Sequence, residues 1–186
     1  MRLILDEAGM LQNLEHAVSL WYYDMGGPVR TLHRRLKFRE GYRLGRTLGR
    51  AIAQQLLAVA GAGQKRVPDL IVPVPLHPIR ALERGFNQSE ALAEGIGIEL
   101  GASVSPNALG RRSLTSSQVQ LSRAERLKNL SGAFSLASAE KMLGRHVLIV
   151  DDVITTGATM LAAIDVLEGA PVERCSVASL ALVRPT

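Results

Sequence analysis

An acid pair and a threonine-rich turn follow one another closely in the last third of the chain. An apolar run over 147–150 leads directly to Asp151 and Asp152. The turn after them contains Thr155, Thr156, Gly157, Ala158 and Thr159. Backbone N–H groups of such a turn, at the start of a helix, can surround a phosphate, and threonine hydroxyls add further donors. The carboxylates would repel the phosphate but suit neighbouring sugar hydroxyls or a divalent cation. The stretch therefore predicts a site for a ribose 5-phosphate.

Two other nucleotide-binding motifs can be tested directly on the sequence. Strands that end in acidic residues also occur in P-loop proteins, but no G-x-x-x-x-G-K-[ST] is present. A dinucleotide fingerprint is also missing, because Gly95, Gly97 and Gly101 have the wrong spacing and lie within a helical pattern. An N-capped helix beside two solvated aspartates would use the same residues without a ligand. We favour the phosphate site, since strand, acid pair, turn and helix occur in the required order.

Strand and helix patterns alternate around this stretch. Apolar runs typical of strands buried on both faces of a parallel sheet cover 70–74, 146–150 and 175–183. Helical patterns cover 88–100, after a capping box at 87–90, and 157–167. This alternation predicts an α/β fold, with a mostly parallel sheet flanked by helices. Ligands in such folds bind at the carboxyl ends of the strands, and Asp151 and Asp152 fall at one of these ends.

The first third of the chain is predicted to be mainly helical. A short strand is expected over 16–23, with its aromatic residues Trp21, Tyr22 and Tyr23 in the core rather than stacked on a base. Pro28 suits the first position of a helix, and a second helix follows and ends near 61–63. We therefore predict a small, mainly helical N-terminal lobe over 1–66, which forms part of the wall of the site, and a core domain over 67–186.

Composition limits the remaining classes of protein. The 186 residues are 47% hydrophobic and 21% charged, which is enough apolar material for a folded core. The uncharged stretches are too short for a membrane-spanning helix, and early acidic residues argue against a signal peptide. Cys175 is the only cysteine, so neither an internal disulfide nor a four-thiolate zinc site can form. A cytoplasmic location is therefore expected.

Positive charge is concentrated over 28–50. The net charge is +5, and Glu40 is the only acidic residue in this stretch. Its basic residues are Arg30, Arg34, Arg35, Lys37, Arg39, Arg43, Arg46 and Arg50. Such a segment can bind the phosphates of a nucleotide or of nucleic acid, and it can equally be a solvated helical face. Both interpretations stay open from the sequence.

Taken together, these motifs resemble those of a known family. The stretch over 147–159 resembles the phosphoribosyl diphosphate (PRPP) binding motif of type I phosphoribosyltransferases. Further segments resemble the ComF/GntX branch of that family, which is linked to natural competence, and they lie at 22–23, 36–38, 72–77, 84–88, 126–129 and 132–134. The likeness covers about 16–183. It departs from many relatives at the N-terminus, where this sequence has no counterpart of their four-cysteine zinc module.

The resemblance implies roles for individual residues. Asp151 and Asp152 would hold the ribose hydroxyls as the catalytic pair, and the turn over 155–159 would bind the 5-phosphate. The loop over 75–84 would face the diphosphate, and its candidate residues are Leu76, Arg80 and Arg84. A polar stretch over 114–122 would be the mobile loop that closes over PRPP. Its candidate contacts are Gln118 within the stretch and Arg123 directly after it.

Two functions follow as expectations. The first is an enzyme that transfers ribose 5-phosphate from PRPP to an acceptor, such as a nucleobase, and releases diphosphate. Mg²⁺ is its expected cofactor, brought by PRPP, with Asp151 and Asp152 as candidate ligands. The alternative is a non-catalytic sensor of PRPP or a nucleotide that binds single-stranded DNA during DNA uptake. The sequence identifies neither the acceptor nor the oligomeric state, and a homo-oligomer remains open.

Overall fold

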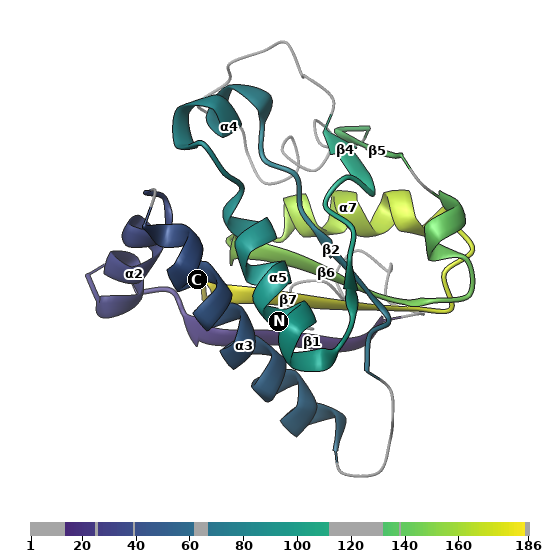
Figure 1. Cartoon of the computed structure of the whole chain (residues 1–186), viewed down its shortest axis with the longest axis horizontal. Coiled ribbons are helices and arrows are strands. Elements are labelled where there is room, and N and C mark those ends of the chain that lie inside the picture. Colours follow the sequence, from purple (N-terminus) through teal and green to yellow (C-terminus); the bar gives the residue numbers. More distant parts are fainter. Residues whose placement is uncertain are drawn as a thin grey trace.

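A parallel five-stranded sheet forms the centre of the molecule. The computed structural model describes residues 14–24, 26–38, 40–61, 67–111, 132–137 and 139–184 (Figure 1). The strands of this sheet are β1 (Leu14–Tyr22), β2 (Leu70–Pro73), β3 (Ser103–Val104), β6 (His146–Ile154) and β7 (Arg174–Leu182). Their order is β1-β7-β6-β2-β3, and every neighbouring pair is parallel. All carboxyl ends therefore lie at the same edge, which points toward α2 in Figure 1.

Helices cover both faces of the sheet. On one face α3 (Gly41–Ala60) and α5 (Gln88–Leu100) pack on the side chains of Leu148 and Val150. On the other face α7 (Ala158–Glu168) packs on Val147 and Ile149, as expected for alternating residues of one strand. The arrangement explains why these strands are apolar throughout. It confirms the predicted α/β fold with a parallel sheet flanked by helices.

Smaller elements lie around the carboxyl edge and the periphery. Helix α2 (Pro28–Leu36) precedes α3, and the short α4 (Pro78–Arg84) follows β2. Figure 1 shows α2 beside the carboxyl ends of the strands and α4 above them. Strands β4 (Leu109–Arg111) and β5 (Phe134–Leu136) form a separate antiparallel pair, and a 3-10 turn spans Ala139–Met142.

Glycines bring α3 and α5 into direct backbone contact. A Cβ atom added at Gly49 would lie 2.1 Å from the carbonyl oxygen of Leu92, and one added at Gly95 would lie 2.1 Å from that of Arg46. Such distances leave no room for a methyl group, so the two helices cross closer than side chains would allow. The beginning of α5, which carries residues of the site described below, is held in place by this crossing.

Strand β1 lies at the edge of the sheet rather than within it. Among the described strands it pairs with β7 alone, and its terminal residues Trp21 and Tyr22 are 38% and 55% exposed. The expectation that these aromatic residues lie in the core is therefore wrong. The predicted boundary at residue 66 stays a prediction, and the elements before it contribute β1 to the sheet and α3 to its cover.

Other side chains lie as their sequence context indicates. Cys175 is buried in β7, and His146 begins β6 with its Nε2 2.7 Å from the hydroxyl of Ser176. In the described ranges, no helix is long and apolar enough to cross a membrane.

Candidate functional site

The candidate site residues lie at the carboxyl ends of β2 and β6. These are neighbouring strands from which the chain continues in opposite directions across the sheet. From β2 the chain crosses to β3 on one side, whereas from β6 it crosses to β7 on the other side. Helix α5 begins after β2 on one face of the sheet, and α7 begins after β6 on the opposite face. Ligands of parallel α/β sheets bind at the carboxyl edge where the strand order reverses in this way, and we call this place the crevice.

The acid pair lies on the last residues of β6. The strand was expected to end at residue 150, but it continues to Ile154, with Asp151 opposite Ser179 of β7. The pairing with the long β7 extends the strand beyond its apolar run. Asp151 and Asp152 therefore lie on neighbouring positions of a strand. The hydrogen bonds of the sheet fix their backbones more firmly than the predicted loop would have done.

Each carboxylate is held by hydrogen bonds. The Oδ1 atom of Asp151 accepts from the Ser89 hydroxyl at 3.1 Å and from its neighbour's backbone N–H at 2.8 Å. In Asp152, Oδ1 accepts from the Val153 N–H at 2.7 Å, and Oδ2 lies 3.1 Å from Nε2 of His33. Ser89 belongs to the first turn of α5 and His33 to α2, so two distant segments, together with the backbone of β6 itself, fix the pair.

The two carboxyl groups differ in charge state. Burial and the nearby charge of Asp152 raise the pKa of Asp151 to about 7. Burial also acts to raise the pKa of Asp152, but the hydrogen bond from His33, the charge of His33, the Val153 N–H and Lys37 outweigh it and leave that pKa below its usual value. Two partly buried carboxylates at adjacent positions resist carrying two charges, and in this pair Asp152 carries the charge more readily.

We expect Asp151→Asn to stabilise the free protein at neutral pH. The unfolded carboxyl ionises near its ordinary pKa of 3.8, whereas the folded one ionises at about 7. The wild type therefore loses stability relative to the variant as pH rises from 3.8, and the loss is complete above 7. The free energy of unfolding at pH 8 should increase by about 2 to 4 kcal/mol, and by less than about 1 kcal/mol at pH 4.

Urea denaturation at both pH values measures this difference. Asp165→Asn is the matched control, because Asp165 is an exposed aspartate of α7, and its stability should change little at either pH. An Asp151→Asn protein that is less stable than the wild type at pH 8 would contradict the assignment of a strained acid pair.

The turn over 155–159 joins the acid pair to α7. Gly157 has a φ of 80°, a left-handed conformation that favours glycine, and it caps the helix that begins at Ala158. The Thr156 hydroxyl lies 3.5 Å from the Ala158 N–H, and a small pocket is lined by the acid pair's Asp151 together with Thr155 and Thr159. The first N–H groups of a helix have no partner within it, so this turn can receive an anion.

Two cations interact electrostatically with the acid pair, Lys37 with Asp152 and Arg111 with Asp151. Burial lowers the pKa of Lys37, and the positive charges of Arg84 and Arg80 lower it further, although Asp152 acts in the opposite direction. Burial likewise lowers the pKa of Arg111, opposed by Asp151 and reinforced by Arg80. These four cations carry more positive charge than the acid pair carries negative charge. Because their positive charges repel one another, an anionic ligand that binds among them is attracted.

Arg80 and Arg84 belong to the segment that follows β2. Part of it forms α4, with Pro78 at its start and Arg84 in its last turn, where a continuous loop was predicted. Arg84 donates to Gln88 at 2.8 Å, and Arg80 is exposed. Leu76 is half-buried at the beginning of the loop. Asn87 caps α5 through the Ser89 N–H and also donates to the Val74 carbonyl oxygen, so its predicted role as a cap is confirmed.

Arg111 is fixed from β4. Its guanidinium donates to the Pro75 carbonyl oxygen at 3.3 Å and lies 5.5 Å from the centre of the Phe134 ring. These two contacts hold the charge close to Asp151 and to the loop after β2.

Sequence reasoning missed several residues of the site. His33, Lys37, Ser89 and Arg111 reach the acid pair or its field from α2, α5 and β4. Only Lys37 had a signal, since it lies in the segment over 36–38 that resembles the ComF/GntX branch. Gln118 and Arg123, the predicted contacts of the mobile loop, lie outside the described residues.

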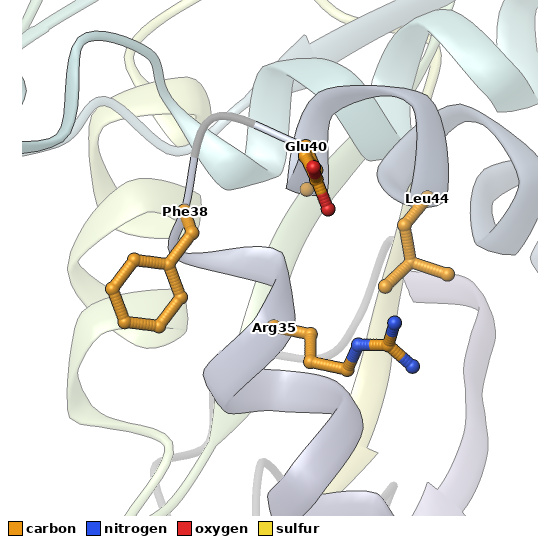
Figure 2. Close-up of a pocket in the computed structure, with 5 residues that line it drawn as sticks. Arg35, Phe38, Glu40 and Leu44 are labelled. Carbon is orange, nitrogen blue, oxygen red and sulfur yellow. The ribbon is translucent and has the colours of Figure 1, made fainter.

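A further pocket lies at the junction of α2 and α3. It has a volume of about 400 Å³ and is lined by Arg35, Phe38, Glu40, Gly41 and Leu44. Figure 2 shows the Arg35 side chain extending toward Leu44, with Glu40 above them and the Phe38 ring on the other side of the view. Lys37 lies between Arg35 and Phe38 in the sequence and interacts electrostatically with Asp152. Lys37, the C-cap residue of α2, therefore interacts with the acid pair, while residues on either side of it line the pocket.

Comparison with known proteins agrees with this architecture. The profile of the phosphoribosyl transferase domain family matches residues 43–185. Competence protein F of Haemophilus influenzae is 36% identical over 155 residues, which cover 83% of this chain and 68% of that protein. The DNA utilization protein YhgH of Escherichia coli is 36% identical over 137 residues, 74% of this chain and 60% of that protein. The chain thus spans about 60% of the length of YhgH.

Solved structures show the same fold at lower sequence identity. The allosteric regulatory enzyme of purine biosynthesis aligns with a TM-score of 0.51 and 21% identity, over 75% of this chain and 26% of that enzyme. The glutamine PRPP amidotransferase from B. subtilis aligns with a TM-score of 0.50 and 20% identity, over the same shares of the two chains. Because the family profile extends over most of the sequence and the relatives agree with it, the chain belongs to the phosphoribosyltransferase domain family as a ComF-like member.

Proposed function

We propose that this protein binds PRPP and transfers its ribose 5-phosphate to an acceptor, with release of diphosphate. The proposal is supported by the acid pair, the turn at the start of α7 that can receive an anion, and the cations that interact electrostatically with the pair. The turn over 155–159 would receive the 5-phosphate, and Asp151 and Asp152 would receive the ribose hydroxyls. Arg80, Arg84 and the other cations would receive the diphosphate.

The chemistry that this arrangement supports is mainly electrostatic. As the bond between C1 of the ribose and the diphosphate oxygen breaks, positive charge grows on the ribose and negative charge on the leaving group. The carboxylate of Asp152 would stabilise the positive charge, and the cations would stabilise the diphosphate. The acceptor then forms its own bond to C1. Both carboxylates are only partly exposed, which strengthens these interactions relative to water.

Magnesium fits the acid pair as an ion shared with the ligand. In the described part of the chain, no three His, Cys, Asp or Glu side chains gather into a metal site. Mg²⁺ is commonly bound by one or two carboxylates together with oxygens of a phosphorylated substrate. Asp151 and Asp152 would hold the ion in this way, and it would neutralise part of the diphosphate charge.

The pocket between α2 and α3 is the place that we propose for the acceptor. Its lining combines an aromatic ring, a guanidinium and a carboxylate, which suits a planar ring with polar edges. Its volume of about 400 Å³ has room for a nucleobase. The last turn of α2 would hold the acceptor beside the ribose, because Lys37 of that turn interacts with Asp152.

Calorimetric titration with PRPP, in the presence and absence of Mg²⁺, tests the proposed function. Binding that requires Mg²⁺ is expected, because the ion reduces the repulsion between the diphosphate and the acid pair. Loss of binding in the double variant Asp151→Asn/Asp152→Asn would assign it to the crevice. A folded wild-type protein that binds no PRPP under either condition would refute the proposal.

A second function, binding of single-stranded DNA, is favoured by a separate observation. Trp21 and Tyr22 are exposed at the carboxyl end of β1, and the guanidinium of Arg184 lies 4.5 Å from the centre of the Tyr22 ring. Exposed aromatic rings beside arginines are the surfaces on which unpaired bases stack. The names of the relatives, Competence protein F and DNA utilization protein, agree with a role in DNA uptake or use.

Fluorescence of Trp21 gives a direct test of this second function, since it is the only tryptophan of the chain. Oligothymidylate is expected to quench the fluorescence, with an affinity that falls steeply as salt rises. Tyr22→Ala should weaken binding about tenfold, because it removes a stacking surface and the contact with Arg184. Tyr42→Ala is the control, since the half-buried Tyr42 belongs to α3 and contacts Glu94 and Phe86 rather than Arg184. Absence of quenching at low salt would exclude single-stranded DNA as a partner of these aromatic residues.

A further inference from the structure

His33 is clamped between the acid pair and the end of β1. Its Nε2 lies 3.1 Å from Oδ2 of Asp152, and its Nδ1 lies 3.4 Å from the hydroxyl of Tyr23. The Tyr23 ring meets the imidazole edge-on, with ring centres 5.7 Å apart and planes at 82°. The His33 side chain is 12% exposed and that of Asp152 is 21% exposed. Tyr23, His33 and Asp152 thus form a chain of contacts that water reaches only in part.

The chemistry of these groups orients the imidazole. An ionised carboxylate only accepts hydrogen bonds, so Nε2 of His33 carries the hydrogen that points to Asp152. When the imidazole is neutral, Nδ1 accepts from the Tyr23 hydroxyl, and when it is charged, Nδ1 donates to the hydroxyl oxygen. Because Oδ1 of Asp152 accepts from the Val153 N–H, both carboxylate oxygens have a donor. The carboxylate cannot turn about its Cβ–Cγ bond without breaking one of these contacts.

Helix α2 does not need His33 to stay on the core. Leu36 of the same helix is fully buried and packs in the cluster that contains Leu48 and Ile52 of α3. Val29 is buried as well. The contact of His33 with Asp152 is therefore available for a role in the crevice, in addition to any part in anchoring the helix.

We propose that His33 is a positioning residue, which holds the Asp152 carboxylate in the orientation that receives a ribose hydroxyl. This inference rests on the proposed function, because it assumes that a ribose phosphate binds in the crevice. His33 acts through Asp152 and need not touch the ligand. Its loss should weaken the recognition of ribose hydroxyls and leave the recognition of the 5-phosphate unchanged, since the turn over 155–159 belongs to a different segment.

Binding of three sugar phosphates to His33→Leu tests the inference. The ligands are ribose 5-phosphate and its 2-deoxy and 3-deoxy analogues, and the measurement is the ratio of affinities for the parent and for each analogue. The wild type should bind ribose 5-phosphate more tightly than either analogue. Each analogue lacks a hydroxyl, so a carboxylate oxygen of the acid pair would lose a hydrogen bond in its complex. In His33→Leu the affinity for ribose 5-phosphate should fall about tenfold, and the preference over at least one analogue should shrink by a similar factor.

A conservative variant separates positioning from anchoring. His33→Gln keeps an N–H donor at a similar reach, so it should restore most of the preference for the parent ligand. If the leucine variant fails to fold, Tyr23→Phe replaces it, because it removes only the hydroxyl that faces Nδ1. Its preference should shrink by a smaller factor than the tenfold expected for His33→Leu.

The outcomes distinguish this inference from the proposed function. A wild type that binds neither PRPP nor ribose 5-phosphate refutes the proposed function and this inference with it. A wild type that binds, with unchanged preferences in His33→Leu, refutes the role of His33 alone. An equal loss of affinity for ribose 5-phosphate and for its analogues also refutes the positioning role of His33. That result is expected if the substitution only displaces α2.

Discussion

Replacement of Asp152 by asparagine is expected to lower the affinity for PRPP at least about 100-fold and to abolish its turnover. The substitution removes the carboxylate that carries the charge of the acid pair and that accepts from His33 and Val153. Hydrogen bonds to charged groups contribute about 1.5 to 3 kcal/mol each, and removal of a group that stabilises the transition state adds to the loss. Calorimetry measures the affinity, and release of diphosphate in the presence of candidate acceptors measures turnover.

The comparison needs variants that bracket the effect. Asp165→Asn makes the same chemical change on the exposed surface of α7 and should bind PRPP like the wild type. The double variant Asp151→Asn/Asp152→Asn sets the lower limit, because no carboxylate of the pair remains. Circular dichroism should show a folded protein in each case, since asparagine keeps an oxygen that accepts the Val153 hydrogen bond. Wild-type affinity in Asp152→Asn would refute the assignment of the ribose site.

Gly95 is buried where α5 crosses α3, and Gly95→Ala is expected to destabilise the protein more than substitutions at exposed positions of α5. The new Cβ atom would lie 2.1 Å from the carbonyl oxygen of Arg46 and 2.9 Å from its Cα atom. Backbone atoms cannot move aside like the end of a flexible side chain, so α3 and α5 must separate. Overpacking of this kind costs about 3 kcal/mol, partly offset by about 1 kcal/mol from the higher helix propensity of alanine.

Thermal unfolding measures this effect. A net loss of about 2 kcal/mol lowers the Tm of a protein of this size by roughly 4 to 8 °C. Gly49→Ala should behave alike, because its Cβ atom would lie 2.1 Å from the Leu92 carbonyl oxygen. Gly26→Ala is the matched control, since no atom lies within 4 Å of the position of its Cβ. A Tm of Gly95→Ala equal to that of Gly26→Ala would show that the two helices are not in backbone contact.

The centre of the site could be predicted because its residues are adjacent in the sequence. Asp151, Asp152 and the turn over 155–159 lie between a strand and a helix whose patterns are both clear. The order of these elements predicts where the side chains lie, since parallel strands share one carboxyl edge. The fold class followed from the same alternation of strands and helices.

The partners of the acid pair could not be predicted, because they come from other segments. His33 precedes Asp152 by 119 residues, and Ser89 precedes Asp151 by 62 residues. Nothing in the local pattern of α2 or α5 indicates that these side chains face a carboxylate. Their placement depends on how α2, α3 and α5 pack on the sheet, which periodicity alone does not determine.

The exposure of Trp21 and Tyr22 shows a related difficulty. An apolar run predicts a strand but does not say whether that strand lies at the edge or in the centre of a sheet. β1 lies at the edge, and its last residues extend past the helical cover to the surface. Three consecutive aromatic residues were therefore expected in the core, whereas two of them are exposed.

The pairing of β1 with β7 has a consequence for folding during synthesis. The backbone N–H of His16 donates to the hydroxyl of Ser176, 160 residues later, and β7 is the sheet neighbour of β1. A ribosome must therefore make almost the whole domain before β1 finds its partner, and such distant contacts slow folding. Until then Leu14 and Val18, both buried in the native protein, are exposed to chaperones and to other nascent chains. We expect this domain to complete its sheet only after translation has passed β7.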